Sequence, residues 1–149
     1  MRVIGTLITI IILVISFQVS AQQSTDKGNR YGADQYGMKK YVMAFLKRGP
    51  HRDKLNKEQR VKLQQQHMAN ISRMAKAQQL VLAGPFLDDG NLRGIYIFNT
   101  ASIEQAREWT ETDPAIKAGS LVLELKPWYG SAAILAVNDI HNEISANAK

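Results

Sequence analysis

The stretch between Leu80 and Asn99 constrains the fold most, because it has the pattern of two strands joined by a turn. Leu80–Ala83 is a short apolar run, and Pro85 follows it with no N–H to give to a sheet, so we expect the first strand to stop there. Asp88–Asn91 contains Asp, Gly and Asn, which tolerate the backbone angles of turns. Ile95–Phe98 is β-branched and aromatic, as strands prefer. The sequence therefore predicts a hairpin-like unit at the centre of the chain.

A helical pattern lies on each side of this unit. Asn56 and Ser102 each have a Gln three residues later, which is the spacing of a capping box at a helix start. Further out, strand-like runs occupy Lys40–Lys47 and Leu121–Trp128. The order strand, helix, strand, strand, helix, strand predicts an α+β fold of the ferredoxin-like βαββαβ type. Its sheet would be four-stranded and antiparallel, with the helices on one face.

The strand at Lys40–Lys47 is apolar on both faces, since both Tyr41/Met43/Phe45 and Val42/Ala44/Leu46 are apolar sets. Helices on one side of a sheet leave the other side uncovered. A homodimer that packs sheet on sheet is the simplest cover, so we expect a homodimer.

The first 21 residues have the layout of a cleavable secretory signal peptide, with a positive start at Arg2, an apolar run from Val3 to Val19 and small residues up to Ala21. We therefore expect a secreted or periplasmic protein whose mature chain begins at Gln22. The alternative is an uncleaved membrane anchor, because the run is only slightly short of the ~20 residues that span a bilayer.

The remaining chain divides into three parts. Residues 22–38 are polar and Gly-rich and predict a flexible arm, residues 39–130 hold the predicted domain, and residues 131–149 predict a C-terminal helical extension. The chain has no cysteine, which excludes disulfides, a lipid-modified cysteine, a thiolate zinc site and a cysteine nucleophile.

The positive charge is concentrated in one part of the chain. The sequence has 19 basic and 13 acidic residues, and nine of the basic ones lie between residues 38 and 62. No aromatic residues are interleaved with them in the manner of a base-stacking surface. We interpret this region as a solvated face and expect no nucleic-acid partner.

His67 is the leading candidate for chemistry. The apolar residues of its helix span an arc of roughly 160° and comprise Val61, Leu63, Met68, Ile71, Met74 and Ala75. His67 falls inside this arc and would point toward the sheet, where partial desolvation favours acid–base chemistry. The alternative is a hydrogen-bonded structural histidine. Asp113 is the second candidate, although its position before Pro114 is explained completely by a helix N-cap.

Asp88, Asp89 and Arg93 form a third group. Arg93 could clamp an anionic substituent of a substrate, or it could pair with one of the turn carboxylates. The three histidines, His51, His67 and His141, are too far apart for paired metal ligands, so we expect no metal. Neither a phosphate-binding glycine loop nor a Gly-x-Ser-x-Gly elbow is present.

The order of several short motifs is more specific than any one of them. His67 is followed by Gly84-Pro85-Phe86, Asp88-Asp89-Gly90, Arg93-Gly94, Ser102 to Ala106, Asp113-Pro114, Ala118-Gly119 and Glu124 to Trp128. In this order the stretch from Tyr41 to Trp128 resembles the YCII-related (YciI-like) domain family, within the dimeric α+β barrel superfamily. The resemblance implies a ferredoxin-like fold that dimerises through its sheets, with an active-site His and Asp at the positions of His67 and Asp113. One branch of the family is similar to enzymes that eliminate chloride from chlorinated hydroxyquinols, and superfamily relatives isomerise lactones or bind small aromatic compounds. The export signal and the extensions on both sides of the domain depart from the family pattern.

Two hypotheses follow. The first is an exported, cofactor-free enzyme that abstracts a proton from a small cyclic or aromatic compound, leading to elimination or isomerisation. His67 would be the base or acid, Asp113 would orient it, and Arg93 and Asp88 would bind the substrate. The second is a small-ligand-binding or assembly module of the cell envelope without turnover.

Overall fold

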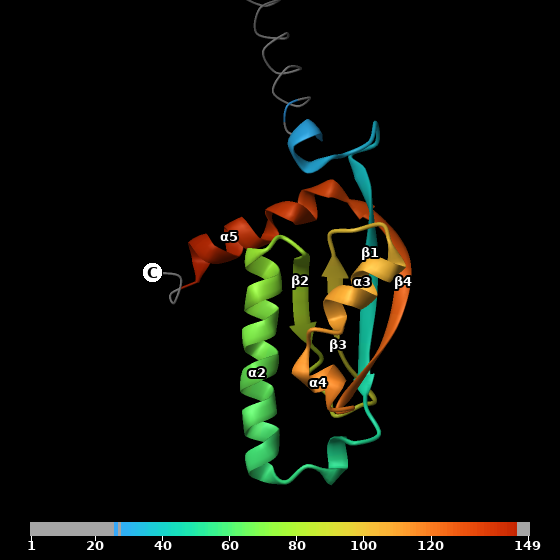
Figure 1. Ribbon diagram of the computed structural model, residues 1–149. Helices are drawn as coiled ribbons and strands as arrows, with labels where there is room; N and C mark the ends of the chain where they lie inside the picture. Colours follow the sequence, from blue (N-terminus) through green and yellow to red (C-terminus); the bar gives the residue numbers. More distant parts are fainter. Residues whose placement is uncertain (1–25, 27, 146–149) are drawn as a thin grey trace, which may run out of the picture.

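The computed structural model of the protein describes residue 26 and residues 28–145 (Figure 1). The expected signal segment and its cleavage site after Ala21 lie outside the described residues. The elements are β1 (Met38–Arg48), a 3₁₀ turn η1 (Arg52–Lys54), α2 (Lys57–Lys76), β2 (Leu80–Pro85), β3 (Leu92–Phe98), α3 (Ile103–Thr110), α4 (Pro114–Lys117), β4 (Leu121–Ser131), a 3₁₀ helix η2 (Ala132–Ala136) and α5 (Val137–Ile144).

The four strands form one antiparallel sheet in the order β2-β3-β1-β4. The central hairpin is present as predicted, with Leu80 paired to Phe98 across β2 and β3. Pro85 is the last residue of β2, and β2 is an edge strand, where the missing N–H costs no ladder bond. The predicted α+β, ferredoxin-like fold is therefore confirmed.

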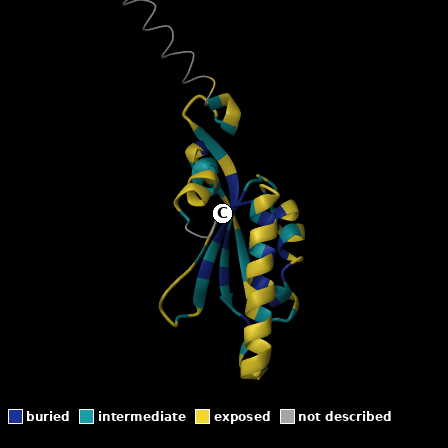
Figure 2. Cartoon of the chain, turned by 90° about the vertical axis from the view of Figure 1, so that its left-hand side faces the viewer, coloured by how far each residue is buried: buried dark blue, intermediate teal, exposed yellow. Residues whose placement is uncertain are grey.

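Helices α2, α3 and α4 cover one face of this sheet. The core between them contains Val42, Ala44, Leu46, Met74, Leu80, Tyr96, Phe98, Ala106, Ala115 and Leu121. Exposed residues follow the outer side of α2, whereas the buried ones lie toward the strands (Figure 2). The alternation along β1 sends every second side chain into this core, which is why Val42, Ala44 and Leu46 are buried together.

The second face of the sheet is covered in part by the chain itself. Tyr41, Val81 and Ile97 are buried there against Ile134 and Leu135 of η2. Asn138 holds α5 to the sheet edge, because its side-chain amide donates a 2.9 Å hydrogen bond to the carbonyl of Leu80. The chain itself therefore covers this end of the second face, which the sequence pattern leaves for a partner subunit. The C-terminal extension was predicted as a helix, but it begins as a 3₁₀ helix and becomes α-helical only at Val137.

The two helix starts differ in their caps. At Asn56 the capping box is complete, because Asn56 Oδ1 accepts from Gln59 N and Gln59 Oε1 accepts from Asn56 N, both at 2.9 Å. At Ser102 only half of the predicted box forms. Ser102 Oγ accepts from Gln105 N at 3.1 Å, but the Gln105 side chain accepts from Thr100 Oγ1, which also satisfies the N–H of Ser102.

The described part of the N-terminal arm is attached to the sheet. Residues 28–31 are helical, and Asp34 Oδ1 accepts from the N–H groups of Tyr36 and Met38. The hydroxyl of Tyr129 donates to the other carboxylate oxygen of Asp34, and this hydrogen bond lowers the pKa of Asp34. None of the helices in the described residues is both long and apolar enough to span a bilayer.

Candidate active site

Helix α2 places His67 against the sheet. The residues of α2 that are buried are His67, Asn70 and Met74, one turn or two turns apart on one side of the helix. Val61 and Met68, at one edge of the predicted apolar arc, are instead 53% and 50% exposed. The buried stripe is thus rotated toward Asn70, and His67 lies near its middle rather than at its edge.

The short helix α4 holds Asp113 from the other side. Asp113 is its N-cap, and Oδ1 accepts a 2.9 Å hydrogen bond from the N–H of Ala115. Pro114 occupies the first helical position, and Gly119 follows the helix with a φ of +66°, a conformation that favours glycine. The predicted helix N-cap at Asp113 is confirmed, and it fixes a carboxylate whose exposed fraction is 0%.

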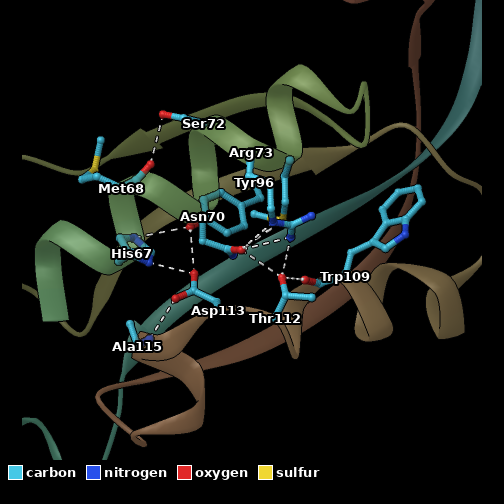
Figure 3. A network of polar contacts seen from close by, with 11 residues as sticks. His67, Met68, Asn70, Ser72, Arg73, Tyr96, Trp109, Thr112, Asp113 and Ala115 are labelled. Atoms are coloured by element: carbon cyan, nitrogen blue, oxygen red, sulfur yellow. Dashed lines mark hydrogen bonds and ion pairs between the residues drawn. The ribbon is translucent and has the colours of Figure 1, made fainter.

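His67 and Asp113 meet, although 46 residues separate them in the sequence. His67 Nδ1 lies 2.8 Å from Asp113 Oδ2, and only 10% of the His67 side chain is exposed (Figure 3). An ionised carboxylate can only accept hydrogen bonds. Nδ1 therefore carries the ring proton and donates a hydrogen bond to Asp113 Oδ2. The second ring nitrogen, Nε2, is then left to accept a proton. This is the arrangement in which a carboxylate orients a histidine for acid–base chemistry.

A third side chain, which the sequence reasoning missed, completes the cluster. Tyr96 of β3 places its hydroxyl oxygen 3.3 Å from His67 Nε2 and 3.4 Å from Asp113 Oδ2 (Figure 3). Burial and the nearby Asp113 carboxylate raise the pKa of Tyr96 far above its ordinary value, so its hydroxyl stays protonated. The sequence does contain a signal for Tyr96, which is its position in an apolar strand. A tyrosine hydroxyl that faces a core needs a polar partner there.

A second polar network lies next to the cluster. Asn70 Oδ1 accepts from Arg73 Nη2 at 3.0 Å and from Arg73 Nε at 3.2 Å, and Arg73 Nη2 also donates to Thr112 Oγ1 at 2.8 Å. Thr112 directly precedes Asp113, so this network ties α2 to the residue beside the buried carboxylate (Figure 3). Among the described residues, no carboxylate lies within ion-pair distance of Arg73. The sequence reasoning did not identify these residues.

The predicted substrate-binding residues are not brought to the pair. Arg93 Nη1 donates to the carbonyls of Asp88 and Gly90 and to Asp89 Oδ1, each at 3.1 Å. Asp89 also pairs with Arg48 at 3.0 Å. Arg93 therefore stabilises the β2–β3 turn, and Asp88 contributes its backbone carbonyl there. The structure thus shows the alternative in which Arg93 pairs with a carboxylate of the turn.

Within the described residues there is no group of three or more His, Asp or Glu side chains that could hold a metal ion. His51 and His141 are exposed and lie outside the cluster around His67. The groups that meet at the candidate site are therefore an imidazole, a carboxylate and a phenol, all of which act by moving or holding protons.

Comparison with known proteins gives three similarities. The model of the YCII-related domain matches residues 40–129. The "Uncharacterized protein YjpA" of Bacillus subtilis (strain 168) is 32% identical over 71 residues, which is 45% of this chain and 81% of that protein. Among solved structures, the chain is similar to "5-chloro-2-hydroxyhydroquinone dehydrochlorinase (TftG) from Burkholderia phenoliruptrix AC1100", in complex with 2,5-dihydroxybenzoquinone. That similarity has 18% identity and a TM-score of 0.44, and covers 60% of this chain and 93% of the other. Because the family model spans more than half of the sequence and includes both His67 and Asp113, the chain belongs to the YCII-related domain family.

Proposed function

We propose that the protein is a cofactor-free enzyme that abstracts a proton from a small cyclic or aromatic compound and so promotes elimination or isomerisation. The observation that carries the proposal is the buried contact between His67 Nδ1 and Asp113 Oδ2. Asp113 would hold the ring so that Nε2 is free to take the proton, and it would stabilise the imidazolium that forms. Export from the cytoplasm is part of the proposal. Mass spectrometry of the intact mature protein is expected to give the mass of a chain that begins at Gln22.

One observation favours a second candidate, a ligand-binding or assembly module without turnover. Every polar atom of the cluster named above has a protein partner, and a closed network of this kind also serves to hold α2, β3 and α4 together. The two candidates differ in what they require of Nε2. Only the enzyme needs this nitrogen to exchange protons with a bound compound.

The deciding experiment follows proton exchange directly. The protein is incubated in D₂O with a panel of phenols, quinones and lactones that carry acidic C–H groups, and NMR records deuterium uptake or elimination. The wild-type chain is expected to accelerate the reaction of at least one compound. His67→Gln is expected to lower that rate about 100-fold, the usual contribution of a positioned base.

The matched control is His51→Gln, which changes an exposed histidine outside the cluster and should leave the rate unchanged. Circular dichroism of both variants verifies the fold. Equal rates for wild type and His67→Gln would rule out the enzyme, and binding of a compound without any exchange would support the module.

We also propose a homodimer that uses the rest of the second sheet face. Met43, Phe45 and Ile95 are only partly buried in the single chain, and Phe45 and Ile95 lie outside the apolar cluster that contains Ile134 and Leu135. Light scattering is expected to give twice the mass of one chain for the wild type. Phe45→Glu should reduce it to a single mass, because it places a charge in the interface. A single mass for the wild type contradicts the dimer.

A further inference from the structure

Helix α5 turns its apolar side away from the sheet. Ile140 and Ile144 are 52% and 77% exposed, whereas Asn138 of the same helix donates its side-chain amide to the Leu80 carbonyl at 2.9 Å. At about 100° per residue, Ile140 and Ile144 lie about 200° and 240° around the helix from Asn138. The attachment of Asn138 to the sheet edge therefore directs both isoleucines outward, and α5 extends past the edge strand β2 in this orientation (Figure 1).

The charges of α5 indicate what could cover this apolar side. The helix contains two acidic residues, Asp139 and Glu143, and no Lys or Arg. A second copy of α5 is a poor partner, because the acids of both helices would then lie close together and repel. An anionic lipid surface would repel the helix for the same reason. The fitting partner is therefore a surface that presents apolar side chains among positive charges.

The outer side of α2 is a surface of this kind. Val61 and Met68 are 53% and 50% exposed, and Met68 points away from the buried cluster around His67 (Figure 3). Lys57 and Lys62 line a shallow hollow around Val61. Over its whole length α2 carries one acidic residue, Glu58, and five basic ones, which are Lys57, Arg60, Lys62, Arg73 and Lys76.

The apolar side chains of the two helices also have matching spacing. Val61 and Met68 are seven residues apart on α2, and Val137 and Ile144 are seven residues apart on α5. Seven residues make two turns, so each pair lies on one side of its helix, about 10.5 Å apart along the axis. The two helices can therefore pack along their length, with the acids of α5 beside the lysines of α2.

We propose that α5 of one copy of the chain packs on the outer side of α2 of a second copy. The outer side of α2 faces away from the sheet, so this contact is separate from the sheet-to-sheet dimer, and it does not depend on proton transfer by His67. The two surfaces differ, so the contact is heterologous and can continue from copy to copy. Two turns of helix bury much less than the roughly 1,000 Å² of a stable interface. The contact is therefore transient, and light scattering of dilute protein still reports the sheet-to-sheet association alone.

The test is disulfide trapping, which suits a chain without native cysteine. Val61→Cys gives an α2 thiol protein and Ile144→Cys gives an α5 thiol protein, and both also carry Phe45→Glu to remove sheet-to-sheet association. The two proteins, one with a mass tag, are mixed and oxidised with oxidised glutathione. We expect the mixed disulfide to form about ten-fold faster than the disulfide of either protein with itself, because opposite charges steer the two helices together.

The matched control replaces the α2 thiol with Leu87→Cys. Leu87 lies between β2 and β3 and is 99% exposed, so it would react faster than Val61→Cys if exposure alone decided the rate. Its neighbours in the sequence are Asp88 and Asp89 rather than lysines. We expect its mixed disulfide with the α5 thiol protein to lack the ten-fold advantage.

A charge exchange tests the electrostatic part of the contact. Asp139→Lys together with Glu143→Lys in the α5 thiol protein should remove the ten-fold advantage, since both helices are then basic. Adding Lys57→Glu and Lys62→Glu to the α2 thiol protein should restore it. A general loss of folding or of thiol reactivity in the first pair would not be reversed by the second, so the restoration is specific to the contact.

The opposing outcomes are equally defined. A mixed disulfide that forms no faster than the self-disulfides would overturn the contact, and so would an advantage that the charge exchange fails to restore. Sedimentation of the protein with phosphatidylcholine vesicles that is lost in Ile144→Glu would assign α5 to a lipid surface instead. None of these results alters the rate expected for His67→Gln, so failure of this contact is distinct from failure of the proposed function.

Discussion

Asp113→Ala is expected to lower the free energy of unfolding by about 3 kcal/mol. The change removes the cap on the Ala115 N–H, which is worth about 1 kcal/mol, and leaves the buried Nδ1–H of His67 without an acceptor, which costs about 2 kcal/mol. Urea unfolding followed by circular dichroism measures the change. A loss below about 0.5 kcal/mol, the range of an ordinary surface substitution, would show that the buried pair does not form.

The matched variant is Asp113→Asn, which separates the two roles of this residue. Asn is as good an N-cap as Asp, so we expect a loss of only about 1 kcal/mol of stability. The amide nitrogen, however, presents N–H groups to His67 Nδ1 and favours the tautomer with the proton on Nε2. If the proposed function holds, this variant loses turnover as fully as His67→Gln while it remains folded.

Phe98→Ala is expected to cost about 4 kcal/mol, the usual range for removal of a fully buried aromatic ring. Phe98 has an exposed fraction of 0% and lies between Tyr96 and Trp109, with ring centroids 5.7 Å and 6.0 Å away. The cavity would remove the support on one side of Tyr96. Urea unfolding measures the loss, and Phe86→Ala is the control, because Phe86 is 43% exposed and should change stability by less than about 0.5 kcal/mol.

Equal losses for Phe98→Ala and Phe86→Ala would contradict the core described above. The same two variants also report on the site. If the packing of Phe98 holds Tyr96 near His67, the ¹⁵N resonances of the His67 ring should move in Phe98→Ala and remain in place in Phe86→Ala.

The strand and helix order could be predicted because its signals are local. Pro85, the turn at Asp88–Asn91 and the cap at Asn56 each act within a few residues, and each lies where the sequence predicts. The same holds for Asp113 as the cap of α4. The half-formed capping box at Ser102 shows the limit of local rules. Thr100 bonds both to the Gln105 side chain and to the Ser102 N–H, and the capping-box spacing takes no account of Thr100.

Other features depend on distant segments and could not be found from local patterns. The end of the second sheet face is covered by Ile134 and Leu135, because the chain turns back across the sheet after β4. Burial of Ile134 and Leu135 favours this path of the chain. Where they can be buried depends on which apolar surface the folded sheet presents near the end of β4.

The sequence by itself determined the fold class, the family and the two residues most suited to acid–base chemistry, because caps, turns and alternating strands depend on near neighbours. Only the tertiary structure decided that His67 and Asp113 touch, that Tyr96 lies between them, and that Asn70 is buried where Met68 is not. The physical reason is that a buried polar group must find its partner in space, and the partners here come from helices and a strand that are far apart along the chain.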